Sequence, residues 1–438
     1  MTWPLPGWLA RAAAARPDRP AVIADDGTLT YRELAASAAA AAGFLAGLGA
    51  APGSRVAIVL PPGAAFAVAL HGCWALGAVP VPISPRLTGA ERAVQADGAA
   101  AVIDGPLAGA GVPAALPAAH DPAAPAVIVH TSGTTGAARP VALTFGNLWS
   151  SAIGSALALG LHPDERWLSA LPVSHVGGLS ILVRSAIYAT TAQLHGRFDA
   201  ERTADALARG EATLVSLVPT TLSRVLDTGL DRALGLRGAL VGGGPLAPEL
   251  AARARAAAVP VAQTYGLTEA ASQVATSAVG EPQTAGLPLA GTALSIAADG
   301  EILVAGPTVA PGAAGPDGWL HTGDLGSLDA RGRLTVLGRA DEMIVTGGEN
   351  VAPAEVEAAL GTHPAVREAA VFGRPDPEWG HAVVARVVLR DGAAIDGDGL
   401  RAHCAQRLAA FKVPKAIELA PEPLPRTPSG KLRRAALS

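Results

Sequence analysis

Hydrophobic positions along the chain fall into two alternating patterns. Residues 30–49 carry large apolar side chains at helical spacing on an alanine background, and a second helical stretch runs from about residue 65 to residue 76. Residues 56–60, 79–83 and 126–129 are instead short, continuously apolar runs. Strands buried on both faces of a parallel sheet have such runs, whereas amphipathic helices have the helical period. The alternation therefore predicts a parallel α/β sheet with helices on its faces.

The same alternation returns later in the chain and then changes. Residues 213–218 and 238–241 are predicted strands with a helix between them. From about residue 284 to residue 338, short strands alternate with glycine turns, which predicts a small β subdomain. Mixed helices and strands follow. We expect an α/β fold in two domains: a large N-terminal domain of parallel α/β sheets plus the β subdomain over 1–340, and a small α+β domain over 341–438.

Composition narrows the classes of protein to consider. Half of the 438 residues are hydrophobic and 16% are charged, so a large core is expected and disorder is not. The net charge of -4 leaves no basic excess, which argues against nucleic acid and membrane surfaces as partners. Two cysteines cannot form a disulfide framework or a structural zinc site. No stretch resembles a signal peptide or a membrane span, and we expect a cytoplasmic protein.

One loop indicates phosphate chemistry. It follows directly on the apolar run 126–129 and consists of Thr131, Ser132, Gly133, Thr134, Thr135 and Gly136. A glycine-rich loop after a strand can turn backbone N–H groups toward phosphates, and Ser and Thr hydroxyls add donors. No Gly-Lys-Ser/Thr triplet follows, so this is not a Walker A loop. The alternative is a plain flexible loop, but the preceding strand favours phosphate binding.

A lysine near the end of the chain is unusual for this protein. The chain has three lysines, all within its last 27 residues, whereas its many other basic residues are arginine or histidine. Lys431 closes the sequence Pro-Ser-Gly-Lys at 428–431. A compact ammonium can reach a carboxylate or a phosphate as a point charge. Lys431 and the 131–136 loop are therefore candidates for two halves of one ATP-using site.

Several other motifs are weak when taken singly. Tyr265 could offer a face to a nucleobase, and Glu269 is a hard oxygen ligand suited to Mg²⁺, but the segment could equally be an ordinary turn. The glycines at 242–244 are typical of a loop at a strand end, and Asp324 is typical of a turn. The pair 347–348 indicates either a turn or a close approach of backbone to a ligand. Their joint order is more informative than any one of them.

Together these motifs resemble the acyl-adenylate-forming superfamily, which includes acyl-CoA synthetases, peptide-synthetase adenylation domains and luciferases. The resemblance covers nearly the whole chain. It implies that the small C-terminal domain is mobile and that the protein uses ATP, Mg²⁺ and coenzyme A. Besides the motifs above, it rests on residues 16–22, 30–34, 338–342, 353–357, 363–366 and 411–415.

The resemblance also implies roles for individual residues. Glu269 would ligate Mg²⁺, and Lys431 would catalyse adenylate formation. Asp341 matches the hinge, and Gly347 and Gly348 match the loop that lines the pantetheine channel. The ATP-binding set would comprise the 131–136 loop with Gly242, Gly243, Gly244, Pro245, Tyr265, Gly266, Thr268, Glu269, Asp324 and Arg339.

Two features depart from the family pattern. The phosphate loop usually ends in Pro-Lys-Gly, whereas residues 138–140 are Ala-Arg-Pro here. Arg139 keeps the charge, but Pro140 has no backbone N–H and would stiffen the loop exit. The chain is also short for the family, with trimmed loops.

Residues 171–184 bear on the choice of acid. Amino-acid-activating members of the family usually carry an Asp here to pair the substrate ammonium, and this segment has none. Arg184 lies in an otherwise apolar helical run, where an unpaired charge is costly. It either pairs with a protein carboxylate or anchors a second carboxylate on the substrate through its two-pronged guanidinium.

This segment, with residues 144–147 and 269–274, resembles the o-succinylbenzoate–CoA ligases of menaquinone biosynthesis, whose substrate is a dicarboxylic acid. That resemblance implies ATP-dependent conversion of 2-succinylbenzoate to its CoA thioester through an acyl-adenylate. The alternatives are another aryl- or acyl-CoA synthetase, or an adenylating enzyme that loads a carrier protein. Partners would be the acid, ATP and CoA, and a homodimer stays open. The acid site would comprise His175, also catalytic, with Gly177, Gly178 and Arg184.

Overall fold

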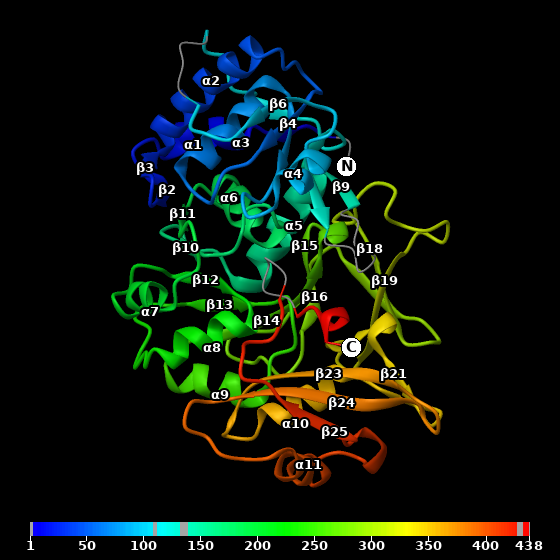
Figure 1. The fold of residues 1–438 in the computed structure, drawn as a ribbon. Coiled ribbons are helices and arrows are strands. Elements are labelled where there is room, and N and C mark those ends of the chain that lie inside the picture. Colours follow the sequence, from blue (N-terminus) through cyan, green and yellow to red (C-terminus); the bar gives the residue numbers. More distant parts are fainter. Residues whose placement is uncertain (1–2, 108–111, 132–138, 427–431, 438) are drawn as a thin grey trace.

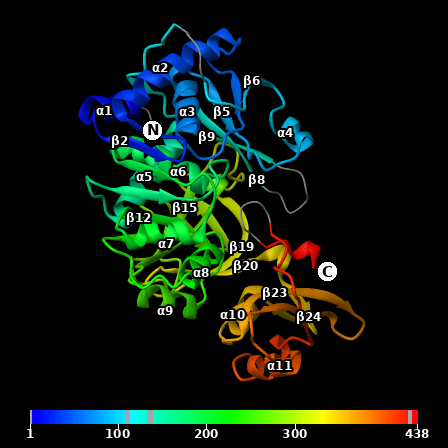
Figure 2. The same ribbon diagram turned by 60° about the vertical axis from the view of Figure 1, so that its left-hand side comes forward.

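A computed structural model describes residues 3–107, 112–131, 139–426 and 432–437. The chain forms a large N-terminal domain, blue through yellow in Figure 1, and a smaller C-terminal domain, mostly orange and red. Figure 2 shows the C-terminal domain below the larger one. Among the helices that the structure describes, none is both long and apolar enough to cross a membrane.

A nine-stranded sheet runs through the N-terminal domain. Its inner strands, from β14 to β2, are parallel, and its outer strands are antiparallel to their neighbours. Strands β11, β12 and β13 are buried along their whole length, which explains why β12 and β13 are mostly apolar. In spatial order the strands are β16 (Leu287–Pro288), β15 (Ser272–Thr276), β14 (Val261–Leu267), β13 (Gly238–Val241), β12 (Leu214–Leu217), β10 (Arg166–Ser169), β11 (Thr191–Leu194), β2 (Pro20–Ala24) and β3 (Gly27–Thr30).

Smaller sheets complete this domain. A parallel three-stranded sheet is formed by β5 (Val79–Pro82), β4 (Arg55–Ile58) and β6 (Ala99–Ile103). Two antiparallel pairs are β8 (Pro125–Thr131) with β9 (Arg139–Thr144), and β1 (Leu5–Pro6) with β7 (Ala119–His120). The β subdomain is an antiparallel sheet of β17 (Ala293–Ile296), β18 (Glu301–Ala305), β19 (Leu320–Leu328) and β20 (Leu334–Arg339).

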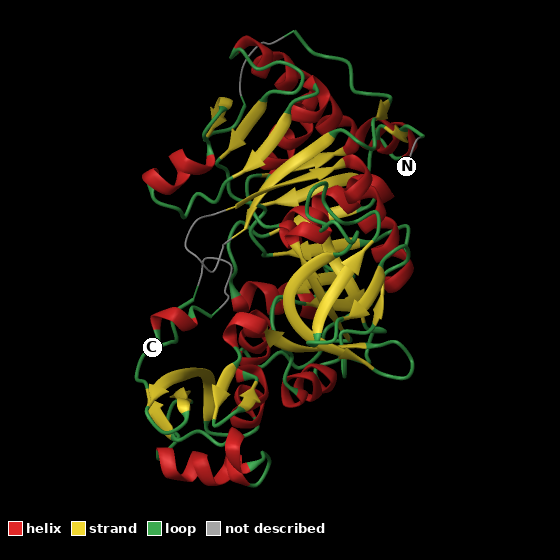
Figure 3. Ribbon diagram, turned by 90° about the vertical axis from the view of Figure 1, so that its right-hand side faces the viewer, coloured by secondary structure: helices red, strands yellow, loops and turns green. Residues whose placement is uncertain are grey.

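Helices cover the sheets, as Figure 3 shows in red against yellow strands. Helices α2 and α5 begin at capping boxes, in which Thr30 pairs with Glu33 and Thr144 pairs with Asn147. The helices of the N-terminal domain are α1 (Trp8–Ala15), α2 (Tyr31–Gly47), α3 (Ala64–Leu76), α4 (Gly89–Gln95), α5 (Phe145–Leu159), α6 (Val176–Tyr188), α7 (Ala200–Ala208), α8 (Pro219–Asp227) and α9 (Pro248–Ala256), with a 3-10 turn η1 (Thr268–Ala270).

The C-terminal domain is an α+β unit built on one five-stranded sheet. An ion pair joins it to the N-terminal domain, with Arg390 Nη1 at 3.5 Å from Asp227 Oδ1. Its elements are η2 (Ala340–Glu342), β21 (Ile344–Thr346), β22 (Glu349–Val351), α10 (Pro353–Gly361), β23 (Val366–Asp376), β24 (Gly380–Leu389), α11 (Gly397–Ala405), η3 (Ala410–Lys412), β25 (Ala416–Leu419) and η4 (Arg434–Ala436).

The fold class and the elements expected from the hydrophobic pattern are confirmed, with shifted ends. The stretch 30–49 forms α2. The run 56–60 forms β4, which begins one residue earlier, at Arg55, and ends at Ile58. Shortly before the run 126–129 the structure also holds the two-residue strand β7, which the hydrophobic pattern did not predict. The predicted domain boundary after residue 340 falls inside η2 and stays a prediction.

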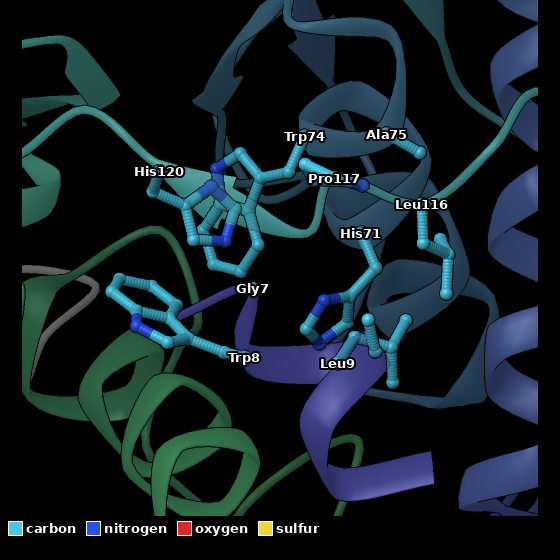
Figure 4. A pocket seen from close by; sticks show the side chains of 10 residues that line it. Gly7, Trp8, Leu9, His71, Trp74, Ala75, Leu116, Pro117 and His120 are labelled. Atoms are coloured by element: carbon cyan, nitrogen blue, oxygen red, sulfur yellow. The ribbon is translucent and has the colours of Figure 1, made fainter. Parts of the chain in front are cut away.

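An aromatic cluster fixes the N-terminal segment against the start of α5. Figure 4 shows Trp8, His71, Trp74 and His120 around a small cavity. The His120 ring stacks on Phe145, the first residue of α5, with centroids 4.2 Å apart. Burial lowers the pKa of His71 to about 3 and that of His120 to about 4, so both rings are neutral in the folded protein.

These two histidines should make the protein less stable in acid. Their pKa values are lowered in the folded state, so the unfolded chain binds protons first, and stability present above about pH 6.5 is lost as pH falls toward 4. Between pH 7.5 and pH 5 we expect a loss on the order of 1–2 kcal/mol per histidine. Urea unfolding at the two pH values measures it. His120→Phe keeps an aromatic ring but removes one titrating group, so an unchanged pH dependence in this variant would refute the assignment.

Candidate active site

The candidate site begins where strands of the large sheet end. Strand β13 ends at Val241 and leads directly into Gly242, Gly243, Gly244 and Pro245. A Cβ at Gly242 would lie 2.7 Å from Thr264 Cγ2 on neighbouring β14, and Gly243 has φ of +79°. Packing and backbone conformation therefore both favour glycine here. Loops at the carboxyl ends of parallel strands are the usual ligand sites of open α/β sheets.

Three residues predicted to bind the nucleotide contact one another. The Tyr265 hydroxyl donates to Asp324 Oδ2 at 2.6 Å, and Arg339 Nη1 donates to Asp324 Oδ1 at 3.3 Å. Asp324 and Arg339 are direct partners across β19 and β20, whereas Tyr265 comes from β14 of the large sheet. Burial, the Asp324 charge and their hydrogen bond raise the pKa of Tyr265, which keeps the phenol protonated as a donor.

Gly266 lies near the end of β14, and Thr268 and Glu269 follow it on the tight turn η1 between β14 and β15. Gly266 lies at a bulge, where a Cβ would be 1.7 Å from Ser272 O, so no other residue fits. Ala271, just after η1, has φ of +53°, and Ser272 has φ of +97°. Non-glycine residues rarely adopt such angles, and strain of this kind concentrates at functional sites.

Glu269 presents a half-buried carboxylate on this turn. Its carbonyl oxygen accepts from Ala310 N at 2.8 Å, which fixes the backbone. In the described ranges, no cluster of three or more His, Cys, Asp or Glu side chains is suited to a metal. A single carboxylate fits Mg²⁺, since this ion commonly takes one or two protein carboxylates and fills its shell with phosphate oxygens and water.

The hairpin β8–β9 carries the predicted phosphate loop. Thr131 ends β8 opposite Arg139, and its Oγ1 donates to Arg139 O at 3.4 Å. Arg139 and Pro140, at the exit of the loop, are paired residues of β9. The other loop residues predicted to bind ATP lie outside the described residues, as does Lys431; they are Ser132, Gly133, Thr134, Thr135 and Gly136.

The residues predicted to bind the acid lie on helix α6. His175 is its N-cap residue, and its carbonyl accepts from Leu179 N at 3.0 Å. A Cβ at Gly178 would lie 2.4 Å from Pro172 O, so this glycine lets the helix pack against the preceding loop. Gly177 has no such close contact: the nearest atom to its Cβ position is Leu171 Cδ1 at 3.7 Å.

Arg184 lies deeper on the same helix and is 2% exposed. Its guanidinium lies 5.5 Å from the Trp167 ring centroid, and Nη2 donates to Ser151 Oγ at 3.2 Å. Its Nε has no hydrogen-bond partner, and no carboxylate of the described residues pairs with it. Burial lowers the pKa of Arg184 to about 10, which leaves it charged at neutral pH. The first alternative for this residue, pairing with a protein carboxylate, is therefore not observed.

The predicted hinge and channel residues lie where the C-terminal domain begins. Asp341, on η2, accepts from Arg339 Nε at 3.3 Å. Gly347 and Gly348 have φ of +57° and +84° and form the two-residue turn between β21 and β22. Positive φ at both positions is the requirement of a type I′ hairpin turn, which explains both glycines locally.

Two further candidate residues escaped the sequence analysis. The Trp379 ring, 38% exposed, lies over the Gly347 turn, and Lys415 Nζ is 4.5 Å from its centroid. A lone Trp carries no spacing signal, and Lys415, although it lies in the segment 411–415 that carries the family resemblance, was assigned no role from the sequence. Ser151 was missed because a lone Ser likewise carries no spacing signal.

Comparison with known proteins identifies the family of this chain. The AMP-binding enzyme family matches residues 9–104 and 102–313, and the AMP-binding enzyme C-terminal domain matches residues 355–431. A 2-succinylbenzoate–CoA ligase of Geobacillus kaustophilus is 40% identical over 99% of this chain and 97% of its own length. The chain belongs to the 2-succinylbenzoate–CoA ligase family.

Solved structures of this ligase family show the same fold. The o-succinylbenzoate CoA synthetase of Bacillus subtilis in complex with its acyl-adenylate intermediate matches with a TM-score of 0.91 at 35% identity, over 100% of this chain and 98% of that one. A double mutant of the same synthetase bound to a product analogue, at 36% identity over 100% and 99% of the two chains, matches with a TM-score of 0.74. This chain is thus closer in overall arrangement to the adenylate-bound ligase.

Proposed function

We propose that this protein is an ATP-dependent acid–CoA ligase that converts 2-succinylbenzoate to 2-succinylbenzoyl-CoA in menaquinone biosynthesis. The observation that carries the proposal is the full-length similarity to a curated ligase, at 40% identity. The succinyl carboxylate attacks the α-phosphorus of ATP, which gives an acyl-adenylate and pyrophosphate. The CoA thiol then attacks the acyl carbon and displaces AMP, leaving its proton to solvent.

The nucleotide half of the site supports the first step. Asp324 and Arg339 are placed to hold the ribose hydroxyls, and the loop from Thr131 to Gly136 is assigned to the phosphates. Glu269, with Gly266 and Thr268 on the same turn, is assigned to the ATP phosphates through Mg²⁺, which a relative from Bacillus subtilis binds together with ATP. Mg²⁺ neutralises phosphate charge and orients the nucleotide when bound. Lys431 is assigned to the charge that develops in the transition state.

Arg184 supports the choice of a dicarboxylic acid. A buried cation without a protein carboxylate nearby is costly unless another group compensates it. The second carboxylate of 2-succinylbenzoate would supply that charge, directly or through a water molecule. His175, at the start of the same helix, with Gly177 and Gly178, is assigned to the reacting end.

The second step needs a different arrangement of the domains. We assign Asp341 as the residue about which the C-terminal domain turns, and Gly347 and Gly348 as the lining of the pantetheine channel. The exposed Trp379 ring and Lys415 lie beside that turn, where they suit the adenine and phosphates of CoA. The partners are small molecules; we place the enzyme in the cytoplasm, and light scattering will distinguish a monomer from a homodimer.

Lys431→Ala tests the adenylating role. Losing one positioned electrostatic donor should slow pyrophosphate release with 2-succinylbenzoate by about 10²–10³-fold. Thioester formation from added acyl-adenylate should change much less, because that step does not use this lysine. Single-turnover assays of the two half-reactions measure both, and equal losses would refute the role. Wild-type enzyme that prefers benzoate or a fatty acid would refute the proposed substrate.

Arg184→Ala tests the anchor for the second carboxylate. Hydrogen bonds to charged groups contribute about 1.5–3 kcal/mol, so kcat/KM for 2-succinylbenzoate should fall roughly 10–150-fold. The monocarboxylate 4-phenyl-4-oxobutanoate should lose far less, since it has no second charge to place. Arg184→Lys keeps the charge without the two-pronged fork. Its kcat/KM for 2-succinylbenzoate should therefore lie between that of the wild type and that of Arg184→Ala. Similar losses with both acids would contradict the anchor.

Gly348→Asn tests the channel while preserving the turn. Asn adopts positive φ more readily than other non-glycine residues, and nothing lies within 4 Å of the Gly348 Cβ position. If pantetheine passes here, the new side chain should slow thioester formation about 10-fold or more and leave pyrophosphate release intact. Gly392→Asn is the matched control, because Gly392 has φ of +77° and equally open surroundings. Normal CoA turnover by Gly348→Asn would exclude Gly348 from the channel.

A further inference from the structure

Ser151 connects the acid side of the site with the metal side. It lies on α5 and is 2% exposed. Its hydroxyl oxygen accepts from Arg184 Nη2 at 3.2 Å and donates to Ala271 O at 2.6 Å. One hydroxyl thus makes both of its hydrogen bonds, one to a buried cation and one to the backbone just beyond Glu269. Arg184, Ser151 and Ala271 come from three separate elements that only the fold brings together.

The turn that receives this hydrogen bond cannot hold its shape alone. Ala271 and Ser272 both have positive φ, at a cost of about 1–3 kcal/mol each. Such a conformation persists only where its surroundings hold it. Among the described residues, two hydrogen bonds from outside the turn reach it: Ser151 Oγ to Ala271 O, and Ala310 N to Glu269 O at 2.8 Å. Ser151 is thus one of the contacts that hold the turn on which Glu269 lies.

Arg184, which donates to Ser151, has an incomplete set of hydrogen bonds among the described residues. Its Nε is buried and has no acceptor in the part of the chain that the structure describes, where the Ser151 hydrogen bond and the Trp167 ring hold the guanidinium. A carboxylate arriving at this guanidinium would fix its orientation, and with it the Ser151 hydroxyl. An ordered hydroxyl would in turn hold the Ala271 carbonyl and the strained turn more firmly.

We propose that Ser151 is a positioning residue that couples binding of the second carboxylate of the acid, at Arg184, to binding of Mg·ATP at the Glu269 turn. The coupling rests on the proposed function, because it needs Arg184 to receive the carboxylate and Glu269 to serve the metal. Its consequence is selectivity: an acid with the second carboxylate completes the nucleotide site, and one without it does not. By thermodynamic linkage, bound Mg·ATP raises the affinity for the dicarboxylic acid by the same factor.

Equilibrium binding measures this coupling without turnover. The probe is α,β-methylene-ATP with Mg²⁺. Its P–CH₂–P link does not break, so it cannot transfer its adenylyl group to the acid. It is titrated by calorimetry with no acid, with 2-succinylbenzoate, or with 4-phenyl-4-oxobutanoate. In the wild type we expect the dicarboxylic acid to tighten the probe at least about 5-fold. The monocarboxylic acid should tighten it about 2-fold or less. This comparison needs no variant, so it tests the proposal even if a substitution at Ser151 prevents folding.

Three variants then assign the coupling to the hydroxyl. Ser151→Ala removes both hydrogen bonds and should bring the effect of the dicarboxylic acid down to that of the monocarboxylic acid. Ser151→Thr keeps a hydroxyl and should retain most of the coupling. Ser185→Ala is the matched control, because the Ser185 hydroxyl is buried next to Arg184 but has no hydrogen-bond partner among the described residues. It should bind as the wild type does.

The outcomes separate this inference from the proposed function. If the wild type adenylates 2-succinylbenzoate but both acids affect the probe equally, the coupling is refuted and the function stands. If Ser151→Ala keeps the full coupling, or lowers affinity for the probe equally with and without acid, Ser151 has only a structural role. If the wild type releases no pyrophosphate with 2-succinylbenzoate, the proposed function fails.

Discussion

The Asp324 carboxylate is the contact on which the arrangement of this molecule depends. Its two oxygens accept from Tyr265, on the large sheet, and from Arg339, at the end of the β subdomain. Arg339 also donates to Asp341, at the start of the C-terminal domain. One chain of charged hydrogen bonds thus links all three parts of the protein. Burial lowers the pKa of Arg339, but the Asp324 and Asp341 carboxylates raise it further, so the net pKa is raised and the guanidinium stays charged.

Under the proposed function, in which Arg339 binds the nucleotide and Asp341 is the hinge, Arg339 has two competing partners. Arg339 cannot keep its bond to Asp341 if the chain at Asp341 changes direction. The Asp341 contact is partly exposed, with both side chains open to solvent, so it is weak and easily exchanged. Asp324 is more buried and keeps its partners within the N-terminal domain. If the C-terminal domain moves, the contact that breaks is therefore the weaker one, between Arg339 and Asp341.

On the acid side of the proposed site, by contrast, a buried charge lacks a charged partner among the described residues. Arg184 is buried beside Trp167 with one hydrogen bond and no protein carboxylate among the described residues. The Glu269 turn nearby keeps two non-glycine residues at positive φ. Both features cost stability in the protein alone. Under the proposed function, the second carboxylate of the acid compensates the charge of Arg184. The core around them, packed from α5, α6 and the large sheet, supplies the stability that this requires.

Local pattern was enough to predict the α/β class, the main strands and helices, and the family. Buried strands are mostly apolar along their length, and amphipathic helices have a periodic hydrophobic pattern. Strands β12 and β13 and helix α2 can therefore be predicted from local sequence, with no knowledge of what they pack against. The resemblance to the acyl-adenylate-forming superfamily likewise implied that Tyr265, Asp324 and Arg339 form one set before any contact was known. Short elements such as β7 were missed, because two residues carry no period.

Tertiary structure alone decided which side chains meet. Two sets of contacts join residues far apart in the chain: the Tyr265–Asp324–Arg339 network, and the hydrogen bonds of Ser151 with Arg184 and Ala271. Only the fold shows that Arg184 Nε has no hydrogen-bond partner among the described residues. A single Ser on a helix has no sequence signal, since its role comes from the two groups that the fold places on either side of it. The two glycines at 347 and 348 show the converse: the sequence indicated a turn or a ligand, and only the backbone angles established the turn. Sequence specifies local conformation and family, whereas pairwise chemistry depends on distances that only the packed chain sets.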